Sequence, residues 1–307
     1  MDIPNLILPV FAVTVTGWLA GASGYLPRSL SGQIVQFAYN VAMPALVFLT
    51  IAKSPRDALL DWRFLAAFGG ATAISFLAVM GIALIGMRRG LASSAMAATA
   101  ASMTNTGFVA LPILKALYGA PGVVPAAIAT AFIAVAMFPV VIVLLEFGGD
   151  GEAKTANIRQ LLETILINPV MVSTILGLGW SMVGLPLPAA AGAYAGTFAD
   201  ALTPCALFSI GLGLTLSDLK GLLGVSAWLT IVKLVLMPLV AYGLATACGL
   251  DHLYTVAAVV CSAVPTAKTA YILSGEYRVE EAMVASAISI STLACIVTLL
   301  VWLAVLV

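Results

Sequence analysis

Residues 100–114 read AASMTNTGFVALPIL, and residues 261–273 read CSAVPTAKTAYIL. Each stretch lies within a long apolar run and contains residues that disfavour a continuous helix, the first around Thr104-Asn105-Thr106-Gly107 and Pro112, the second at Pro265. Proline removes a backbone donor and clashes with the preceding turn, and Thr, Asn and Gly are poor residues for a helix interior. We therefore expect two helices that are interrupted near their centres.

The chain around these stretches is too apolar for a water-soluble protein. Of its 307 residues, 62% are hydrophobic and 8% are charged, and the mean hydropathy is +1.14. A soluble domain carries roughly 25% charged residues, so the composition predicts a protein embedded in the lipid bilayer. The zero net charge and the lack of a basic tract exclude nucleic acid as a partner.

Ten apolar runs are long enough to cross the bilayer as helices, which takes about 20 residues each. The runs are continuous, whereas the strands of a membrane barrel would alternate apolar and polar residues. The sequence therefore predicts an all-α membrane protein with ten transmembrane helices, the first of which has an acidic start and does not read as a secretory signal. The expected helices span residues 5–22, 32–52, 63–87, 92–117, 122–146, 160–183, 188–215, 222–248, 252–274 and 281–306.

The positive charges in the loops predict the side of the membrane on which each loop lies. Seven Lys and Arg residues fall on the face that includes the loop 148–160, and four fall on the other face. Cytoplasmic loops are richer in Lys and Arg. We therefore expect a multi-pass protein of the cell membrane, with the loop 148–160 in the cytoplasm and both termini outside.

The chain also repeats itself weakly at one ungapped offset. Glycine, proline and polar positions coincide, among them Gly17 with Gly177, Pro44 with Pro204, Thr106 with Thr266, and Asn40 with Asp200. Each half then holds five helices, and an odd number inverts the second half in the membrane. We expect two inverted five-helix repeats, 1–147 and 161–307, joined by the central loop 148–160, as in many secondary transporters. The alternative is a bundle that was duplicated for stability.

Interrupted helices at matching places in both halves predict a substrate site near the middle of the membrane. The second half of each broken helix begins with unpaired N–H groups at its positive dipole end, which suits a carboxylate. The alternative role for the Thr/Asn cluster is hydrogen bonding between helices. The candidate substrate-binding residues are Asn40, Thr104, Asn105, Thr106, Gly107, Thr266 and the cationic Lys268, and the expected helix-breaking residues are Pro44, Pro112, Pro204 and Pro265.

Two further ionisable residues, Asp200 and Lys233, lie well inside expected helices. A charge at mid-bilayer costs roughly 3 kcal/mol, so such residues usually face a cavity or a partner. We expect Asp200 to pair with Lys233 or Lys268, or to take up a coupling proton. We expect Lys233 to form a structural ion pair or to contact the substrate. His, Cys, Asp and Glu are not clustered as metal ligands are, so we expect no metal, no cofactor and no enzymatic site.

In three motifs, the chain resembles the auxin efflux carrier family, within the bile acid/sodium symporter superfamily. The resemblance rests on NVAMPALVF at Asn40–Phe48, ASMTNTGFVALP at Ala101–Pro112 and VPTA at Val264–Ala267. The short central loop is similar to that of the bacterial branch, which includes malonate and malate carriers. The resemblance implies a scaffold domain of helices 1, 2, 6 and 7, a transport domain of helices 3–5 and 8–10, a crossing of the broken helices 4 and 9, and a homodimer.

The resemblance further implies that Asn105 and the half-helix starts near Gly107 and Thr266 hold a carboxylate while the transport domain moves like an elevator. We expect a carrier of a small organic anion, with a malonate-like dicarboxylate favoured, in a bacterial inner membrane. Sodium-coupled relatives place acidic or amide side chains around the crossover, where only Asn105 qualifies here, so a coupling proton is favoured over sodium. The alternatives are a uniporter or channel-like carrier of monocarboxylates or auxin-like aromatic acids, and a sodium-coupled organic anion symporter.

Overall fold

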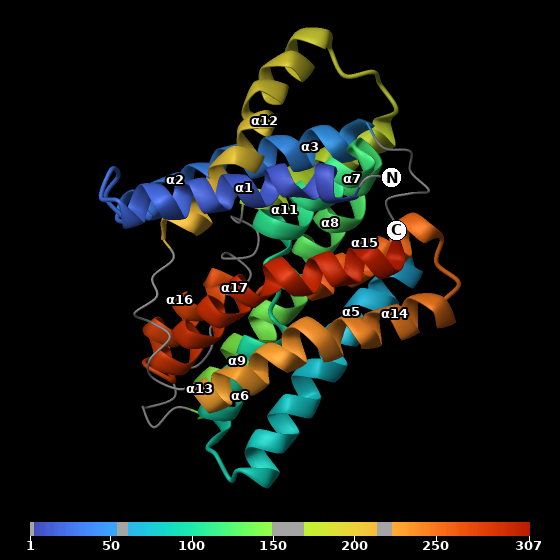
Figure 1. Cartoon of the computed structure of the whole chain (residues 1–307). Coiled ribbons are helices and arrows are strands. Elements are labelled where there is room, and N and C mark those ends of the chain that lie inside the picture. Colours follow the sequence, from blue (N-terminus) through green and yellow to red (C-terminus); the bar gives the residue numbers. More distant parts are fainter. Residues whose placement is uncertain (1–2, 54–60, 149–168, 214–222) are drawn as a thin grey trace.

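The computed structural model describes residues 3–53, 61–148, 169–213 and 223–307, and the regular secondary structure within them is helical (Figure 1). The prediction of an all-helical protein is confirmed. The central loop expected at 148–160 lies outside the described residues, apart from Gly148. Within the described ranges, five continuous helices are long and apolar enough to cross a membrane: Leu30–Lys53, Trp62–Gly86, Ala189–Leu212, Gly224–Ala247 and Glu281–Leu306.

In the described first half of the chain, four wide π-helical turns adjoin α-helices: two join one α-helix to the next, one ends a helix and one begins a helix. These turns are Ala38–Ala42, Ile82–Gly86, Thr106–Ala110 and Ile133–Met137. The α-helices are α1 (Ile3–Ala22), α2 (Leu30–Phe37), α3 (Met43–Lys53), α5 (Trp62–Gly81), α6 (Leu91–Ser102), α7 (Leu111–Tyr118), α8 (Ala120–Phe132) and α9 (Phe138–Gly148).

The second half follows the same order. One π-helical turn, Val232–Leu236, joins α13 to α14. The α-helices are α11 (Pro169–Val183), α12 (Ala189–Leu212), α13 (Leu223–Ile231), α14 (Met237–Ala247), α15 (His252–Ala263), α16 (Lys268–Tyr277) and α17 (Glu281–Leu306).

The bounds of corresponding helices recur at a nearly constant interval along the chain. The continuous helix 62–86 recurs with the same length at 223–247, and α6 recurs with the same length as α15. In both cases the interval along the chain is one residue longer than the interval from Gly17 to Gly177. The helix 30–53 recurs at 189–212, one position less. The weak repeat of the sequence therefore has a counterpart in the lengths and positions of the helices.

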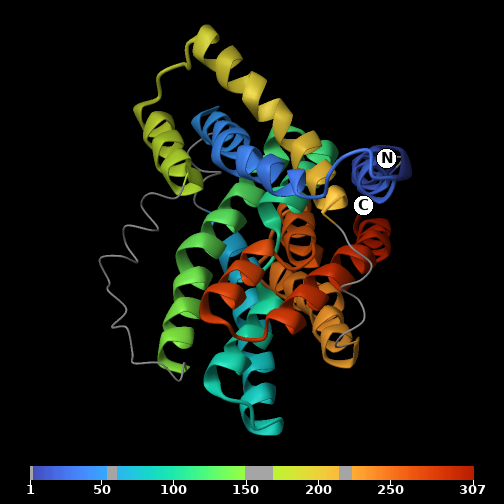
Figure 2. The ribbon, with the colours of Figure 1, turned by 90° about the vertical axis from the view of Figure 1, so that its left-hand side faces the viewer.

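The helices form two groups, which lie one above the other in Figures 1 and 2 and contact each other along their boundary. In one group α1 packs along α12, and α11 packs along α3. In the other group α5 packs against α6 and α14, α14 against α15, and α13 against α17. The half-helix α7 and the start of α8 lie where the two groups meet.

Small residues allow the close packing of α1 on α12. A Cβ atom on Gly211 would overlap the carbonyl oxygen of Thr14, and one on Gly17 would overlap that of Phe208. The packing of α11 on α3 is tight but less close, since a Cβ atom on Gly177 of α11 would lie 3.0 Å from Cβ of Ile51 on α3. Glycines at these positions let helix backbones approach where a larger residue would hold them apart.

Several prolines in this protein lie inside continuous helices and do not break them. Pro44 lies inside the continuous helix Leu30–Lys53, Pro112 inside the continuous segment Thr106–Tyr118 and Pro204 inside α12, so these three expected breaks are wrong. Four π-helical turns are each followed by a proline two residues after their last residue: Pro44, Pro112, Pro139 and Pro238. The carbonyl four residues before each proline, with which its ring would clash, thus belongs to a widened turn. Such π adjustments are a known way for membrane helices to accept proline.

Candidate functional site

The two interrupted helices meet at their breaks. α6 ends at Ser102 and α15 ends at Ala263, and the next helical segments begin at Thr106 and Lys268. Between these ends the two extended segments pair in antiparallel fashion around Thr104 and Thr266. The N–H of Asn105 donates to the carbonyl of Pro265 at 2.9 Å, and the N–H of Ala267 donates to that of Met103 at 2.9 Å.

The hydroxyls of Thr104 and Thr266 hold this crossover together. Thr104 Oγ1 donates to the carbonyl of Cys261 at 2.6 Å, and Thr266 Oγ1 donates to that of Ala100 at 2.6 Å. Each hydroxyl therefore satisfies a carbonyl near the C-terminal end of the other half-helix, where the helix itself offers no partner. The hydrogen-bonding alternative for these two threonines fits this geometry better than direct substrate contact.

The crossover also corrects the register of the repeat. The reciprocal backbone bonds relate Met103 to Pro265 and Asn105 to Ala267. Thr266 therefore corresponds to Thr104 and not to Thr106, as the ungapped offset implied. Backbone pairing decides the register here, because residue identity is a weak guide in segments so rich in Thr and Ala.

Asn105 and Lys268 are the two candidates that the structure leaves for a ligand. The Asn105 residue is 8% exposed, and its side-chain amide makes no hydrogen bond within the described residues. Lys268 is the first residue of α16, where its positive charge adds to the positive end of the helix dipole. No ion pair in the described part of the chain uses Lys268. The arrangement suits an anion that approaches the start of α16.

Thr106 and Gly107 face neighbouring helices. Thr130 of α8 donates its hydroxyl hydrogen to the carbonyl of Ala126, so Thr106 is the donor in the 2.8 Å contact between the two threonine hydroxyls. A Cβ atom on Gly107 would overlap Cε of Met43 on α3. The second half of the broken helix therefore lies directly against the helix 30–53.

The residues that contact this half-helix from α2–α3 were missed by sequence reasoning. The ring of Tyr39 stacks on that of Phe108 with centroids 6.2 Å apart, and Met43 covers Gly107. Asn40, one of the expected ligands, is exposed in the same π-helical turn, and its side chain makes no hydrogen bond in the described structure. Met43 of the motif Asn40–Phe48 and the adjacent Tyr39 therefore contact the half-helix that follows the crossover, whereas Asn40 is exposed.

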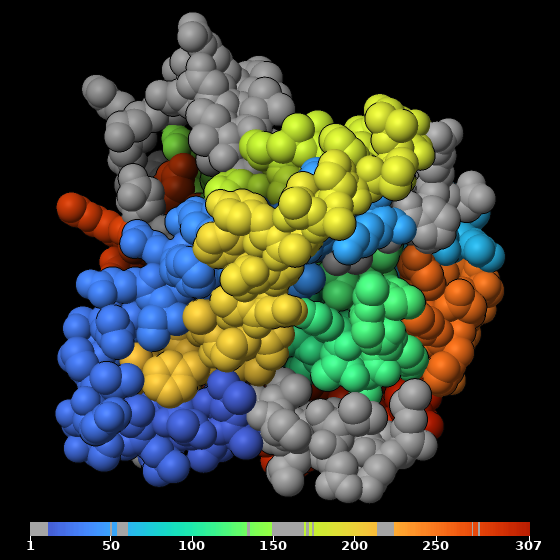
Figure 3. Space-filling view, turned by 90° about the horizontal axis from the view of Figure 1, so that it is seen from above, coloured from blue at the N-terminus to red at the C-terminus, as the bar shows by residue number. Residues whose placement is uncertain are grey.

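Asp200 and Lys233 lie in different environments, the first exposed and the second buried. Asp200 Oδ1 lies 3.1 Å from Lys115 Nζ of α7, and the Asp200 side chain is 81% exposed. The expected pairing of Asp200 with Lys233 or Lys268 is therefore wrong, since Asp200 lies on the outer face of α12. Figure 3 shows the green segment that includes α7 lying directly beside α12 (yellow). Lys233 is fully buried in the π-helical turn after α13, and its amino group donates to the carbonyl of Ser262.

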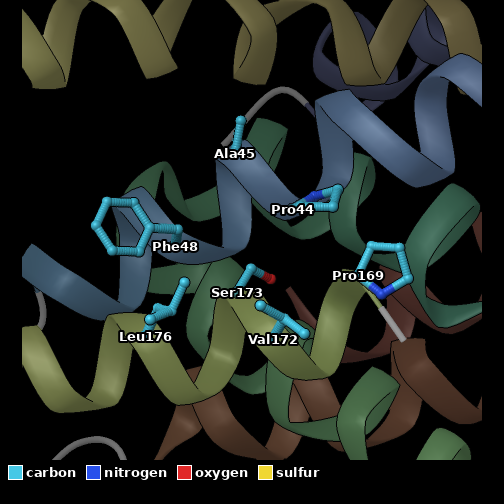
Figure 4. Close-up of a pocket in the computed structure, with 7 residues that line it drawn as sticks. All are labelled: Pro44, Ala45, Phe48, Pro169, Val172, Ser173 and Leu176. Atoms are coloured by element: carbon cyan, nitrogen blue, oxygen red, sulfur yellow. The ribbon is translucent and has the colours of Figure 1, made fainter. Parts of the chain in front are cut away.

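A separate groove of about 470 Å³ lies between α3 and α11 (Figure 4). Among the described residues that line it, Ser173 is the only polar side chain, and the others are apolar: Pro44, Ala45, Phe48, Pro169, Val172 and Leu176. The described lining offers no cation and few donors for a carboxylate, so the groove is not the candidate anion site.

Comparison with known proteins gives related sequences along the whole chain. The family described as "Membrane transport protein" matches residues 3–303. The "Putative malonate transporter" of Rhizobium meliloti (strain 1021) is 26% identical over 299 residues, which cover 97% of this chain and 93% of that protein. The "Uncharacterized transporter YfdV" of Escherichia coli (strain K12) is 25% identical over 309 residues, with 96% and 95% covered. An "Uncharacterized transporter" of Methanothermobacter thermautotrophicus is 25% identical over 304 residues, with 98% of both covered.

Proposed function

The chain belongs to the membrane transport protein family of the auxin efflux carriers, whose members are transporters and not enzymes, and we propose that it is a secondary transporter for a small organic anion. It is a multi-pass membrane protein. We place it in the cell membrane, a bacterial inner membrane, with both termini outside and the central loop cytoplasmic. The favoured substrate is a malonate-like dicarboxylate.

The crossover of the two broken helices carries this proposal. Two half-helices begin there, at Thr106 and Lys268, so their unpaired N–H groups present positive dipole ends to one small region. Lys268 adds a cation and Asn105 adds an amide whose hydrogen-bonding capacity is unused in the described structure. One carboxylate of a dianion would lie at the Asn105 side and the other at Lys268. The name of the Rhizobium relative agrees with this chemistry.

Alternating access requires two parts that move against each other. We propose the two inverted five-helix repeats expected from sequence, supported by helix bounds that recur at a nearly constant interval and by the reciprocal bonds of the crossover. The group of α1, α2, α3, α11 and α12 is then the scaffold, and the remaining helices are the transport domain that moves like an elevator. A homodimer, joined through its scaffolds, is part of the proposal.

The crossover favours a proton over sodium as the coupling ion. Sodium sites in transporters use carbonyls of unwound helices. Here the carbonyls of Ala100, Cys261, Met103 and Pro265 already accept hydrogen bonds from the opposite segment, and Lys233 occupies that of Ser262. Each of these carbonyls thus has fewer lone pairs free for a metal cation.

The test is the flux of labelled malonate into proteoliposomes that contain the purified protein, with sodium absent throughout. We expect saturable uptake that increases when the outside is made acidic, and acceleration by unlabelled malonate inside, which a channel would not show. Absence of malonate uptake at any pH, in the presence of sodium as well, would reject the dicarboxylate assignment. Uptake that requires sodium would reject proton coupling and leave the anion assignment standing.

A further inference from the structure

Lys233 is a buried amino group without a carboxylate partner in the described structure. It is 0% exposed, and its hydrogen bond runs to the carbonyl of Ser262, one residue before α15 ends at the crossover. Ser262 lies one helical turn before Thr266 in the chain, so Lys233 borders the proposed anion site without lining it. An ammonium group in such surroundings loses several kcal/mol of hydration. Its presence therefore needs a reason beyond packing.

Buried hydroxyls continue from Lys233 toward the start of α13. Ser226, Thr230 and Lys233 follow one another at intervals of four and three residues, which places them on one face of the helix. All three are buried, and Ser226 Oγ donates to the carbonyl of Met283 in the first turn of α17. A polar stripe thus runs inside the protein from the beginnings of α13 and α17 to the crossover.

Helix α17 adds hydroxyls along the same path. It packs against both α13 and the π-helical turn that holds Lys233, and it carries buried Ser286, Ser289 and Ser291. The hydroxyl of Ser286 and that of Ser262 are fully buried and have no hydrogen-bond partner within the described residues. Ser291 Oγ accepts from the N–H of Thr266 at 3.2 Å, which connects the stripe to the crossover. Unpaired buried hydroxyls of this kind are places where internal water binds.

The elements around Lys233 offer it no fixed anion in the described ranges. The titratable groups that face it are the thiols of Cys261 on α15 and Cys295 on α17. Helix α6 has no ionisable residue. Arg63 of α5 lies at the other end of its helix, where it donates to the carbonyl of Gly249. Tyr242 of α14 is exposed. The charge of Lys233 is therefore balanced only when an anion enters the protein nearby.

We propose that Lys233 is the residue that carries the coupling proton, and that the hydroxyl stripe from Ser226 to Ser262 holds the water through which this proton moves. The inference rests on the proposed anion transport. Lys233 is a neutral amine in the empty protein. It accepts one proton from water when the substrate anion binds at the crossover, and it returns that proton to water along the stripe when the anion leaves. Anion and proton then cross together, because each stabilises the other in the low-dielectric interior.

Proton uptake on binding tests this directly. Malonate is titrated calorimetrically into the purified protein in buffers of different ionisation enthalpy, and the dependence of the heat on buffer gives the protons taken up per anion. We expect about one proton for the wild type and none for Lys233→Met, as linkage requires. Lys53→Met, at the exposed end of α3, is the matched control and should retain the wild-type value. An unchanged proton number in Lys233→Met, or no proton uptake in the wild type, would overturn the proposal.

A second measurement needs no substrate. The wild-type melting temperature should fall as the pH falls through the ordinary titration range of lysine, because the amine of the unfolded chain then takes up a proton that the buried amine does not, and Lys233→Met should lack this part of the pH dependence. Parallel melting curves would count against Lys233 even if malonate transport is established. If no carboxylate binds to the wild type, the proposed function fails, and Lys233 is judged on these curves. Lys233→Gln, which keeps a donor for the Ser262 carbonyl, replaces a methionine variant that does not fold.

Discussion

At the scale of single residues, Lys268 illustrates how position gives a charge its role. A cation at the first residue of a helix is repelled by the helix dipole unless an anion comes close, and Lys268 lies at the first residue of α16. The residue therefore weakens the fold slightly and strengthens the attraction for an incoming anion. Such a balance is expected of a ligand-binding residue and not of a packing residue.

We expect Lys268→Ala to weaken malonate binding by about 10- to 100-fold, because a hydrogen bond to a charged group contributes about 1.5–3 kcal/mol. The measurement is calorimetric titration of the purified variant with malonate. Its melting temperature should equal or exceed that of the wild type, since the unfavourable dipole interaction is removed. Wild-type malonate affinity in a folded Lys268→Ala protein would exclude this residue from the site.

Asp200 is a second residue whose environment decides between two roles. Its carboxylate is exposed and already paired with Lys115. We therefore do not expect it to carry the coupling proton. We expect Asp200→Asn to retain the stimulation of malonate uptake by an acidic exterior and to lose less than about 1 kcal/mol of stability, as exposed ion pairs do. Uptake assays with and without a pH gradient make the measurement. Loss of the pH stimulation in this variant would move proton coupling from Lys233 to Asp200.

At the scale of helices, prolines are accommodated by π-helical turns and by donors from other helices. Pro238 cannot donate to the carbonyl of Leu234, four residues earlier. The indole of Trp302, on α17, donates to that carbonyl at 3.0 Å instead. The indole of Trp302 thus supplies to the Leu234 carbonyl the hydrogen bond that Pro238 cannot donate.

Trp302→Phe should therefore lower the free energy of unfolding by about 1–3 kcal/mol, the effect of leaving a buried polar group without its partner. Thermal or denaturant unfolding of the purified variant in detergent gives the value. Trp62→Phe is the matched control, because Trp62 is 69% exposed and its replacement should change stability little. Equal effects of the two substitutions would mean that the Leu234 carbonyl finds another donor.

The packing of α1 on α12 gives a second prediction for helices. A methyl group on Gly211 would overlap the backbone carbonyl of Thr14, which cannot rotate away. We expect Gly211→Ala to destabilise the protein by about 1–3 kcal/mol, as overpacking does. Gly179→Ala, on α11, meets open space and should be neutral or raise the melting temperature slightly, because alanine favours helix more than glycine. A neutral Gly211→Ala variant would show that α1 and α12 separate readily.

At the scale of the whole molecule, an elevator movement would separate the residues of one ion pair and leave those of another together. Lys115 and Asp200 join the proposed transport domain to the proposed scaffold. Arg89 and Glu280, whose nearest charged atoms lie 3.3 Å apart, join two parts of the proposed transport domain. An elevator must separate the first pair in each cycle and can leave the second intact.

We therefore expect cross-linking of a Lys115→Cys/Asp200→Cys protein to abolish malonate uptake while malonate binding persists. Cross-linking of Arg89→Cys/Glu280→Cys should leave uptake nearly unchanged. The native cysteines are replaced beforehand, and reduction of a cleavable cross-linker should restore transport. Full transport by the cross-linked 115/200 protein would contradict the elevator, whereas arrest of both proteins would place the moving boundary elsewhere.

Several features of this fold could be predicted from local sequence. The helical stretches follow the apolar runs, and the interruptions at 103–105 and 264–267 occur where Thr, Asn and Pro were expected to disfavour a helix. Other local signals misled: Pro44 and Pro204 leave their helices continuous. A proline in a membrane helix is as compatible with a widened turn as with a break, and the surrounding residues decide between the two.

Local sequence is enough to predict which segments are apolar, helical and interrupted, because hydropathy and helix-breaking are properties of a few adjacent residues. Only the tertiary structure decided which groups meet. It paired Thr104 with Thr266 by mutual hydrogen bonds, joined Asp200 to Lys115, and buried Lys233 beside Ser262. These partners lie far apart in the chain. Their meeting depends on how the helices pack, and the weak repeat of the sequence could not resolve it to the nearest turn.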